Sequence, residues 1–149
     1  MASRRKGRIL AFQALYSWDV HYSQTKNPSI PEGLLDFSWA LQTGKTALDG
    51  EMTAFSRLLV TGTVENITEV DAMIQKHLQN WELSRLGRVD LAVLRMSVYT
   101  LMFQKDMPAT IVIDEAIGIS KEFGADDSYR FVNGVLDSIR KTIGETHEK

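Results

Sequence analysis

Cysteine is absent from the 149-residue sequence. The chain therefore has no disulfide framework, no thiolate zinc site and no cysteine nucleophile. No apolar run approaches the roughly 20 residues that a membrane-spanning helix requires. The basic start does not match a signal peptide, because Gln13 interrupts the apolar segment and Trp18-Asp19 stand where a cleavage site needs small residues. Together these absences predict a soluble, cytoplasmic protein.

Signatures of catalysis are also missing. The sequence has no nucleotide-binding glycine loop, no dinucleotide fingerprint and no nucleophile-elbow motif. Two carboxylate pairs, Asp114-Glu115 and Asp126-Asp127, fit helix first-turn and capping positions better than acid–base or metal chemistry. We expect a binding protein without enzymatic activity, cofactor or metal. The histidines lie far apart and lack ligand-like neighbours three or four residues away: His21, His77 and His147.

Apolar residues recur at spacings of three and four along most of the chain, which is typical of amphipathic helices. No segment alternates apolar and polar residues over the length of a strand. The sequence therefore predicts an all-α protein of one domain, with a basic N-terminal arm at residues 1–8 and a frayed tail at 144–149. Helices are predicted over residues 8–22, 32–41, 51–80 with a break near Gly62 or Asn66, 82–104, 108–123, and from a cap at 126–128 onward.

Single residues define these predicted helices further. Pro108 and Gly124 stand at the start and just beyond the end of one of them, an asymmetry that helices favour. Gly87 lies inside the 82–104 helix, where it indicates a close contact with another helix. Positions whose spacing directs them toward the core include Val20, Leu58 and Ile111.

Positive charge is concentrated at one end of the sequence. The net charge is −2, but four of the 17 basic residues fall at positions 4–8, and no acidic residue precedes Asp19. On a helix these cations form a strip that can follow a phosphate backbone, although they oppose the helix dipole there. From the residues alone, a phosphate-binding arm and a solvated basic terminus are equally supported. The cluster consists of Arg4, Arg5, Lys6 and Arg8.

Recognition of single-stranded RNA also needs aromatic platforms and groups that hydrogen-bond to base edges. Tyr16 lies two turns beyond the basic cluster, and Phe131 follows a polar segment at the start of the last predicted helix. Taken by themselves, such aromatics are more often core residues than stacking surfaces. Both interpretations stay open at this level.

Three longer stretches carry a family resemblance. The first joins the basic cluster to residues 11–18, the second covers residues 81–95, and the third covers residues 106–136. In order and spacing they resemble the NusB family of bacterial transcription antitermination proteins, and the third stretch is the most specific. The sequence departs from that family at three positions: Gly7 replaces alanine, Gly118 replaces a charged residue and Thr100 replaces glutamate.

The resemblance implies two perpendicular three-helix bundles, about seven helices in all, and binding to an RNA element called boxA. It also implies a partner, the small-subunit ribosomal protein NusE, on the helices around 83–104 and 108–123. The pair would keep RNA polymerase elongating, notably on ribosomal RNA operons, and the chain itself would be a monomer or a homodimer. A carboxylate can accept hydrogen bonds from base amino groups and thereby read sequence. By motif match, the RNA contacts are Arg4, Arg5, Lys6, Arg8, Tyr16, Asp90, Asp127 and Phe131.

Two other classes of protein compete with this expectation. NusB-like domains also occur in front of ribosomal RNA methyltransferases, but a chain of 149 residues leaves no room for their cofactor-binding catalytic domain. The other competitor is a helical protein-interaction bundle whose basic arm is incidental. Binding of boxA RNA against a scrambled control separates these classes from an RNA-binding adaptor.

Overall fold

A computed structural model describes residues 2–37, 39, 50–79 and 81–148 of the chain. All regular structure in these residues is helical, which confirms the predicted all-α class. They contain six α-helices rather than about seven, together with short 3-10 turns. The elements are α1 (Ala2–Thr25), η1 (Leu34–Asp36), α2 (Gly50–Glu65), α3 (Ile67–Lys76), η3 (Leu83–Arg85), α4 (Arg88–Phe103), α5 (Ala109–Phe123) and α6 (Ser128–Glu148).

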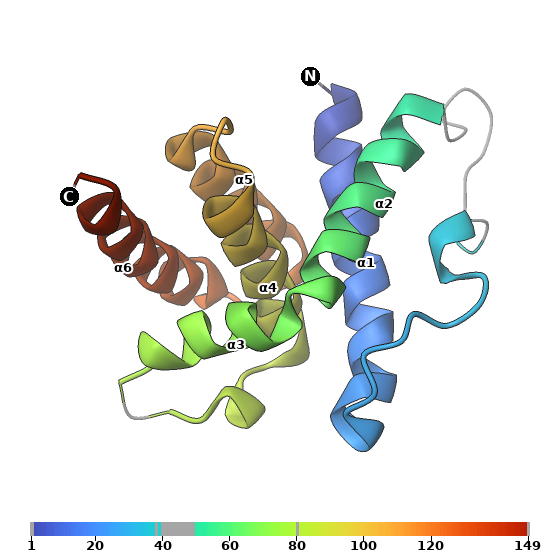
Figure 1. Ribbon diagram of the computed structural model, residues 1–149, viewed down its shortest axis with the longest axis horizontal. Coiled ribbons are helices and arrows are strands. Elements are labelled where there is room, and N and C mark those ends of the chain that lie inside the picture. The colour runs from blue at the N-terminus through green and yellow to red at the C-terminus, as the bar shows by residue number, and fades with distance from the viewer. Residues whose placement is uncertain (1, 38, 40–49, 80, 149) are drawn as a thin grey trace.

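Helix α4 is the centre of the fold and contacts each of the other five α-helices. Figure 1 shows α1 and α2 side by side in one half of the molecule, α5 and α6 in the other half, and α3 crossing between them. Helices α1 and α2 thus pack on each other, as do α5 and α6, while α4 joins both pairs and α3. Among the described residues, no helix is long and apolar enough to cross a membrane.

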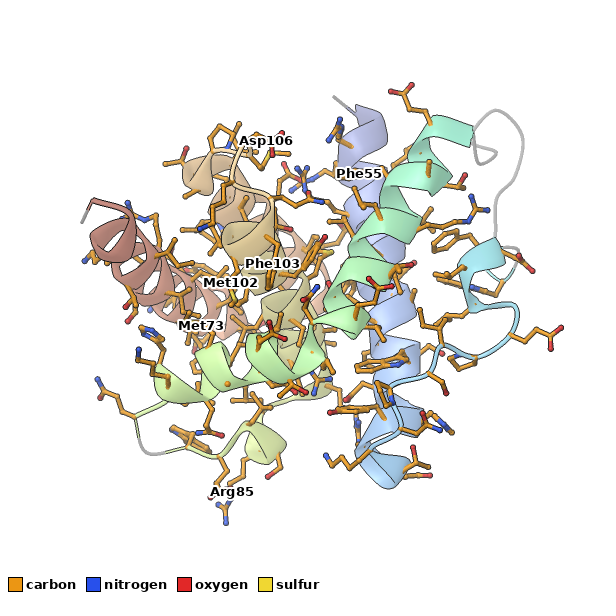
Figure 2. The ribbon with its side chains drawn as sticks, viewed as in Figure 1. Phe55, Met73, Arg85, Met102, Phe103 and Asp106 are labelled. Carbon is orange, nitrogen blue, oxygen red and sulfur yellow. The ribbon has the colours of Figure 1, made fainter. Side chains whose placement is uncertain are left out.

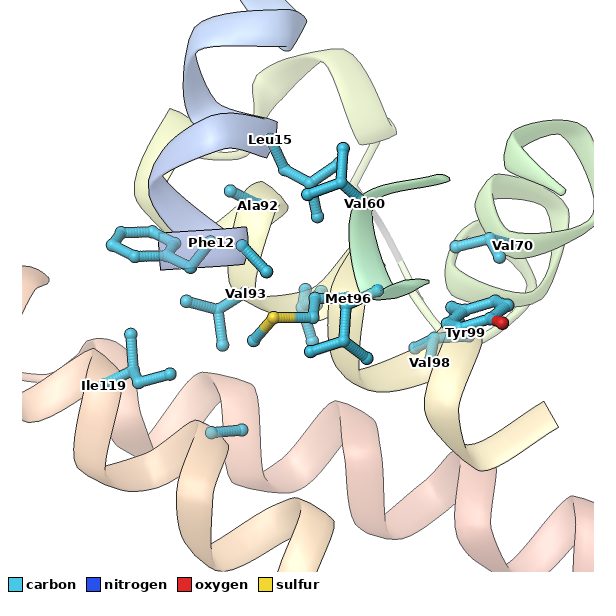
Figure 3. Close-up of a cluster of buried hydrophobic side chains, with 14 of the residues drawn as sticks. Phe12, Leu15, Val60, Val70, Ala92, Val93, Met96, Val98, Tyr99 and Ile119 are labelled. Carbon is cyan, nitrogen blue, oxygen red and sulfur yellow. The ribbon is translucent and has the colours of Figure 1, made fainter. Parts of the chain in front are cut away.

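The central position of α4 explains its unusual burial. Every residue from Leu91 to Leu101 is buried, on all faces of the helix. Figure 3 shows this core, in which Val93 and Met96 of α4 meet Phe12 of α1 and Val60 of α2. This central part of α4 has no free face, so its side chains form the core and are not available to a binding partner.

A buried ion network is enclosed within this core. Arg95 is 3% exposed and donates two hydrogen bonds of 2.9 Å to Asp71 and one of 2.7 Å to Asp19. Burial alone would lower the pKa of Arg95, but the hydrogen bonds and charges of Asp71 and Asp19 outweigh it and raise that pKa. The ion network joins α1, α3 and α4, and a buried arginine without these partners would be strongly destabilising.

The boundaries of α4 correct one sequence prediction. The helix expected from residue 82 begins only at Arg88, after η3 and an extended Leu86. Gly87 precedes the helix, and a Cβ placed on it would lie 3.9 Å from its nearest neighbour, Asp90. The close helix contact expected at Gly87 is therefore wrong. Such a contact occurs at Gly62 instead, where a Cβ would overlap the ring of Tyr99.

Other helix boundaries agree with the sequence to varying degrees. The break expected near Gly62 or Asn66 falls at Asn66, between α2 and α3. Pro108 and Gly124 flank α5 as predicted. The helix expected over 32–41 is reduced to η1 among the described residues, which leave out residues 38, 40 and 41 of that range. Helical backbone continues in α6 to Glu148, beyond the start of the expected frayed tail.

Three apolar residues that were expected in the core are exposed. Val20, Leu58 and Ile111 are 48%, 50% and 46% exposed. Their helices α1, α2 and α5 lie at the periphery, so each buries only the faces that it turns toward its neighbouring helices. Spacing alone predicted a wider apolar stripe than this arrangement covers.

Candidate nucleic-acid interface

The basic cluster occupies the first two turns of α1, because that helix already begins at Ala2. Arg4, Arg5 and Lys6 are exposed, whereas Arg8 is only 9% exposed. The four predicted RNA contacts therefore do not form one uniform solvated strip. Three of them face solvent, and the fourth belongs partly to the packing of the helices.

Three elements hold Arg8 in place. Its guanidinium lies 5.4 Å from the ring centroid of Phe55 on α2 and 3.8 Å from the Met107 sulfur in the α4–α5 connection. It also lies 3.7 Å from the Glu115 carboxylate on α5. Burial lowers the pKa of Arg8; the Glu115 charge raises it, and the charges of Arg4 and Arg5 lower it further. Arg8 thus depends on Glu115 as its counter-charge.

The outer arginines of the cluster are also in contact with the body of the protein. The Arg4 guanidinium lies 4.5 Å from the ring centroid of Phe55, which Figure 2 shows on α2 beside the start of α1. Arg5 donates a hydrogen bond of 3.2 Å from Nε to Glu115. Lys6 is exposed, and its side chain has no ion pair with a described residue.

Gly7 lets this end of α1 pack closely on α2. Its carbonyl accepts a hydrogen bond of 2.8 Å from the Ser56 hydroxyl, and a Cβ on Gly7 would lie 2.7 Å from the Phe55 ring. The absence of a side chain at position 7 therefore brings Phe55 within reach of both Arg4 and Arg8. The glycine that departs from the family pattern has a packing reason here.

Tyr16 lies on the same side of α1 as the residues that contact α5. It is 40% exposed and follows Phe12 by one helical turn. The Phe12 ring lies 5.3 Å from that of Phe123, at the end of α5. The face of α1 from Arg8 to Tyr16 therefore runs beside α5 toward the start of α6.

The two candidate carboxylates occupy helix beginnings. Asp127 is exposed and directly precedes α6, while Asp90 lies in the first turn of α4. Both positions favour negative charge through the helix dipole. Among the described residues, Asp90 Oδ1 is buried without a hydrogen-bond partner, an unusual state for a carboxylate. At the start of α6 it is Ser128 whose hydroxyl accepts a hydrogen bond of 3.1 Å, from the backbone of Ala125.

Phe131 lines an open groove of about 390 Å³ between α6 and the segment that follows α3. The ring is half-buried and packs on the core with one side. Trp81, on the same groove, is 55% exposed, and Arg130 adds a positive charge. The groove therefore offers two aromatic rings and a cation, which is the chemistry that stacks unpaired bases.

The segment that carries Trp81 is fixed by a single side chain of α3. Gln75 donates a hydrogen bond of 2.8 Å to the Trp81 carbonyl and accepts one of 2.8 Å from the Leu83 backbone. The neighbouring His77 ring lies 2.6 Å from the Ser138 hydroxyl of α6. Burial, and then the charge of Lys76, lower the pKa of His77. The floor of the groove is thus pre-organised by contacts between α3 and α6.

Sequence reasoning missed several residues of this surface. Trp81 carried a visible signal, since a tryptophan between Asn80 and Glu82 in a polar segment is a candidate for exposure. Arg130 was recognised only as part of a polar segment. The first-turn position expected for Asp114-Glu115 is wrong, because α5 already begins at Ala109 and has no acidic residue in its first turn. Glu115 instead meets Arg5, 110 residues away along the chain, which no local pattern could indicate.

Comparison with known proteins supports the resemblance that the sequence carries. The family model described as "NusB family" matches residues 5–141. The chain belongs to the NusB family. The transcription antitermination protein NusB of Treponema denticola is 53% identical over 92% of this chain and 95% of its own length. That of Geobacter sulfurreducens is 41% identical over 96% of this chain and 97% of its own length.

Solved NusB structures share the fold. NusB of T. maritima is 35% identical, with a TM-score of 0.76 over 93% of this chain and 90% of that one. A chain from the crystal structure of antitermination factors NusB and NusE in complex with dsRNA is 29% identical. It gives a TM-score of 0.78 over 95% of this chain and 98% of that one. Because each match covers at least 90% of both chains, the NusB-type fold accounts for nearly all of this chain.

Proposed function

We propose that this protein is an RNA-binding transcription antitermination factor, which binds boxA RNA together with a NusE-type ribosomal protein. The observation that carries the proposal is the exposed cation cluster of Arg4, Arg5 and Lys6 at the start of a well-packed helix. Relatives are named transcription antitermination proteins, and a similar solved chain comes from a complex of NusB and NusE with dsRNA. The role is one of binding in the cytoplasm, where transcription occurs, and not of catalysis.

In this proposal the arm binds RNA phosphates, and the groove binds bases. Arg4, Arg5 and Lys6 neutralise phosphates, which supplies affinity that falls as salt rises but gives no sequence preference. Tyr16 and Phe131 stack bases, while Asp90 and Asp127 accept hydrogen bonds from base amino groups. Arg8 contributes less to phosphate binding and mainly anchors the arm, since its side chain is only 11% exposed.

Trp81 extends the proposed base-binding surface beyond the residues that the sequence nominated. Its ring is the most exposed of the large apolar side chains among the described residues, and it lines the groove of Phe131. Base–aromatic stacking contributes about 1–3 kcal/mol per base and tolerates any base. We therefore assign to the groove the stacking of unpaired bases.

The proposed protein-partner surface is narrower than the helices that the resemblance implied. Residues 91–101 of α4 are buried within this chain, so they offer little area to a second protein. Phe103 and Ile111, on either side of the α4–α5 connection, are 43% and 46% exposed. Figure 2 shows Phe103 and Asp106 at this connection. Exposed apolar side chains such as these suit contact with a NusE-type partner.

The test is a filter-binding comparison of boxA RNA with a scrambled sequence, with and without a NusE-type protein. We expect preference for boxA, strengthened by the partner. Phe131→Ala should weaken boxA binding without changing its dependence on salt, because the ring contacts bases and not phosphates. Equal binding of boxA and scrambled RNA would contradict sequence recognition. Binding of the partner but of no RNA would make the chain a protein-interaction bundle.

A further inference from the structure

Glu115 is placed between two arginines of the basic cluster. One oxygen of its carboxylate, Oε1, lies 3.2 Å from Arg5 Nε and 3.7 Å from Arg8 Nη1. The Glu115 side chain is 25% exposed and that of Arg5 is 46% exposed, so solvent partly screens this contact. Two of the four cations of the arm therefore already share an internal anion.

A glycine on the same helix makes room for this arrangement. Gly118 lies one turn after Glu115 on α5, and a Cβ built on it would overlap the guanidinium of Arg5. The Arg5 side chain thus crosses the surface of α5 at a position without a side chain. Glu115 holds Arg5 by charge, and Gly118 provides the space in which Arg5 lies.

We propose that Glu115 is a positioning residue of the arm, which competes with RNA phosphate for Arg5 and Arg8. This inference rests on the proposed RNA-binding function and deepens it. The ligand class is the phosphate of single-stranded RNA. Arg4, whose guanidinium packs on the Phe55 ring, and Lys6 have no ion pair with a described residue, so they bind it without first leaving an internal counter-charge.

The physical reason is the cost of changing partners. A guanidinium bound to a carboxylate must release or share that contact before it neutralises a phosphate, and the remaining carboxylate repels the phosphate. Each phosphate neutralised on a single strand contributes about 0.7 to the slope of log affinity against log salt. Because Glu115 satisfies Arg5 and Arg8 in advance, both contribute less than a free cation. Glu115 therefore weakens the binding of unrelated RNA, which depends on phosphate contacts alone.

The decisive experiment measures binding of a labelled oligouridine to the full chain over a range of salt concentrations. Glu115→Gln should bind it several-fold more tightly at low salt and steepen the slope by about 0.7 for each arginine released. The matched control is Asp114→Asn, which removes the same charge from the adjacent exposed position of α5. Glu115→Asp keeps the charge and should retain a slope close to that of the parent.

A second variant addresses Arg5 separately. Gly118→Ala should displace the Arg5 guanidinium while leaving Glu115 beside Arg8, so its slope should lie between those of the parent and Glu115→Gln. Alanine also favours helix over glycine, and we expect a higher Tm. Tighter RNA binding by a more stable protein separates the charge effect from any loss of folding that Glu115→Gln causes through Arg8.

The outcomes keep this inference distinct from the proposed function. If the parent protein binds no RNA, then the proposed function fails. If the parent binds RNA but Glu115→Gln has the slope and affinity of Asp114→Asn, then the competition is wrong. Weaker binding by a folded Glu115→Gln would also overturn it, since Glu115 would then help the arm to hold phosphate.

Discussion

The start of α1 and the groove beside α6 both carry residues nominated for RNA, but the structure holds their side chains in different ways. In the arm, Arg5 and Arg8 are tied at their charged ends, to Glu115. In the groove, the Trp81 backbone is tied by Gln75, while the ring is 55% exposed. A group that already has a partner must exchange it on binding, whereas a pre-organised free ring need not. The predictions below test this difference, from the largest expected effect to the smallest.

Arg8→Ala should cause the largest loss of stability. It removes contacts with Phe55 and Met107 and leaves Glu115 without its inner partner. Loss of a charged, mostly buried hydrogen-bonding group costs about 1.5–3 kcal/mol. Urea unfolding monitored by circular dichroism measures the free energy directly. Lys6→Ala, in the same two turns, serves as the control and should stay within about 0.5 kcal/mol of the parent. Equal stability of the two variants would show that Arg8 is a solvated cation after all.

Trp81→Ala should weaken RNA binding by about 1–3 kcal/mol while leaving the salt slope and Tm nearly unchanged. The reason is that its ring is exposed and touches no phosphate in the proposed complex. Trp81→Phe keeps a stacking face and should recover most of the affinity. Trp39→Ala is the matched control, because Trp39 is also exposed but does not line the groove. A comparable affinity loss in both tryptophan variants would remove the groove from the RNA path.

Lys6→Ala should flatten the salt dependence of RNA binding by about 0.7, the contribution of one phosphate on a single strand. Lys6 is exposed and forms no ion pair with a described residue, so its full charge is available to a phosphate. Arg5→Ala should flatten the slope less, because Glu115 already offsets part of the Arg5 charge. Titrations at several salt concentrations give both slopes. If Arg5→Ala flattened the slope more than Lys6→Ala, the pairing of Arg5 with Glu115 would not reduce its contribution to phosphate binding.

The smallest effect concerns pH and belongs to the groove. Burial and Lys76 lower the pKa of His77 below its ordinary value of 6.5. The unfolded chain therefore takes up this proton first as the pH falls. Stability should decrease slightly from about pH 6.5 downward and level off below the folded-state pKa. Thermal unfolding across this range measures the change, and His77→Gln should reduce it. An unchanged pH profile in that variant would assign the dependence to other groups.

Much of the fold was predictable because helices leave local marks in sequence. The spacing of apolar residues located α1, α2, α3 and α5, and Pro108 with Gly124 marked both ends of α5. The start of α4 was missed, because Glu82 and Leu86 continue the helical spacing while Gln75 binds this segment in another conformation. Local pattern could not register a hydrogen bond from a different helix.

Part of the candidate interface was predictable from the sequence, but the roles of its residues were not. Charge density indicated the arm, and the family resemblance indicated Tyr16 and Phe131. Neither source distinguished Arg8, which is packed, from Lys6, which is free. That distinction depends on Phe55, Met107 and Glu115, which come from three other parts of the chain.

The sequence by itself determined that this protein is helical, that its positive charge lies at the start of the first helix, and that it belongs with NusB proteins. Those properties follow from short-range spacing and from motifs. Only the tertiary structure decided which arginines are paired, that Trp81 and Phe131 share a groove, and that Arg95 is enclosed between Asp19 and Asp71. The physical reason is that charge pairing and burial depend on distance in space, and these partners are far apart along the chain.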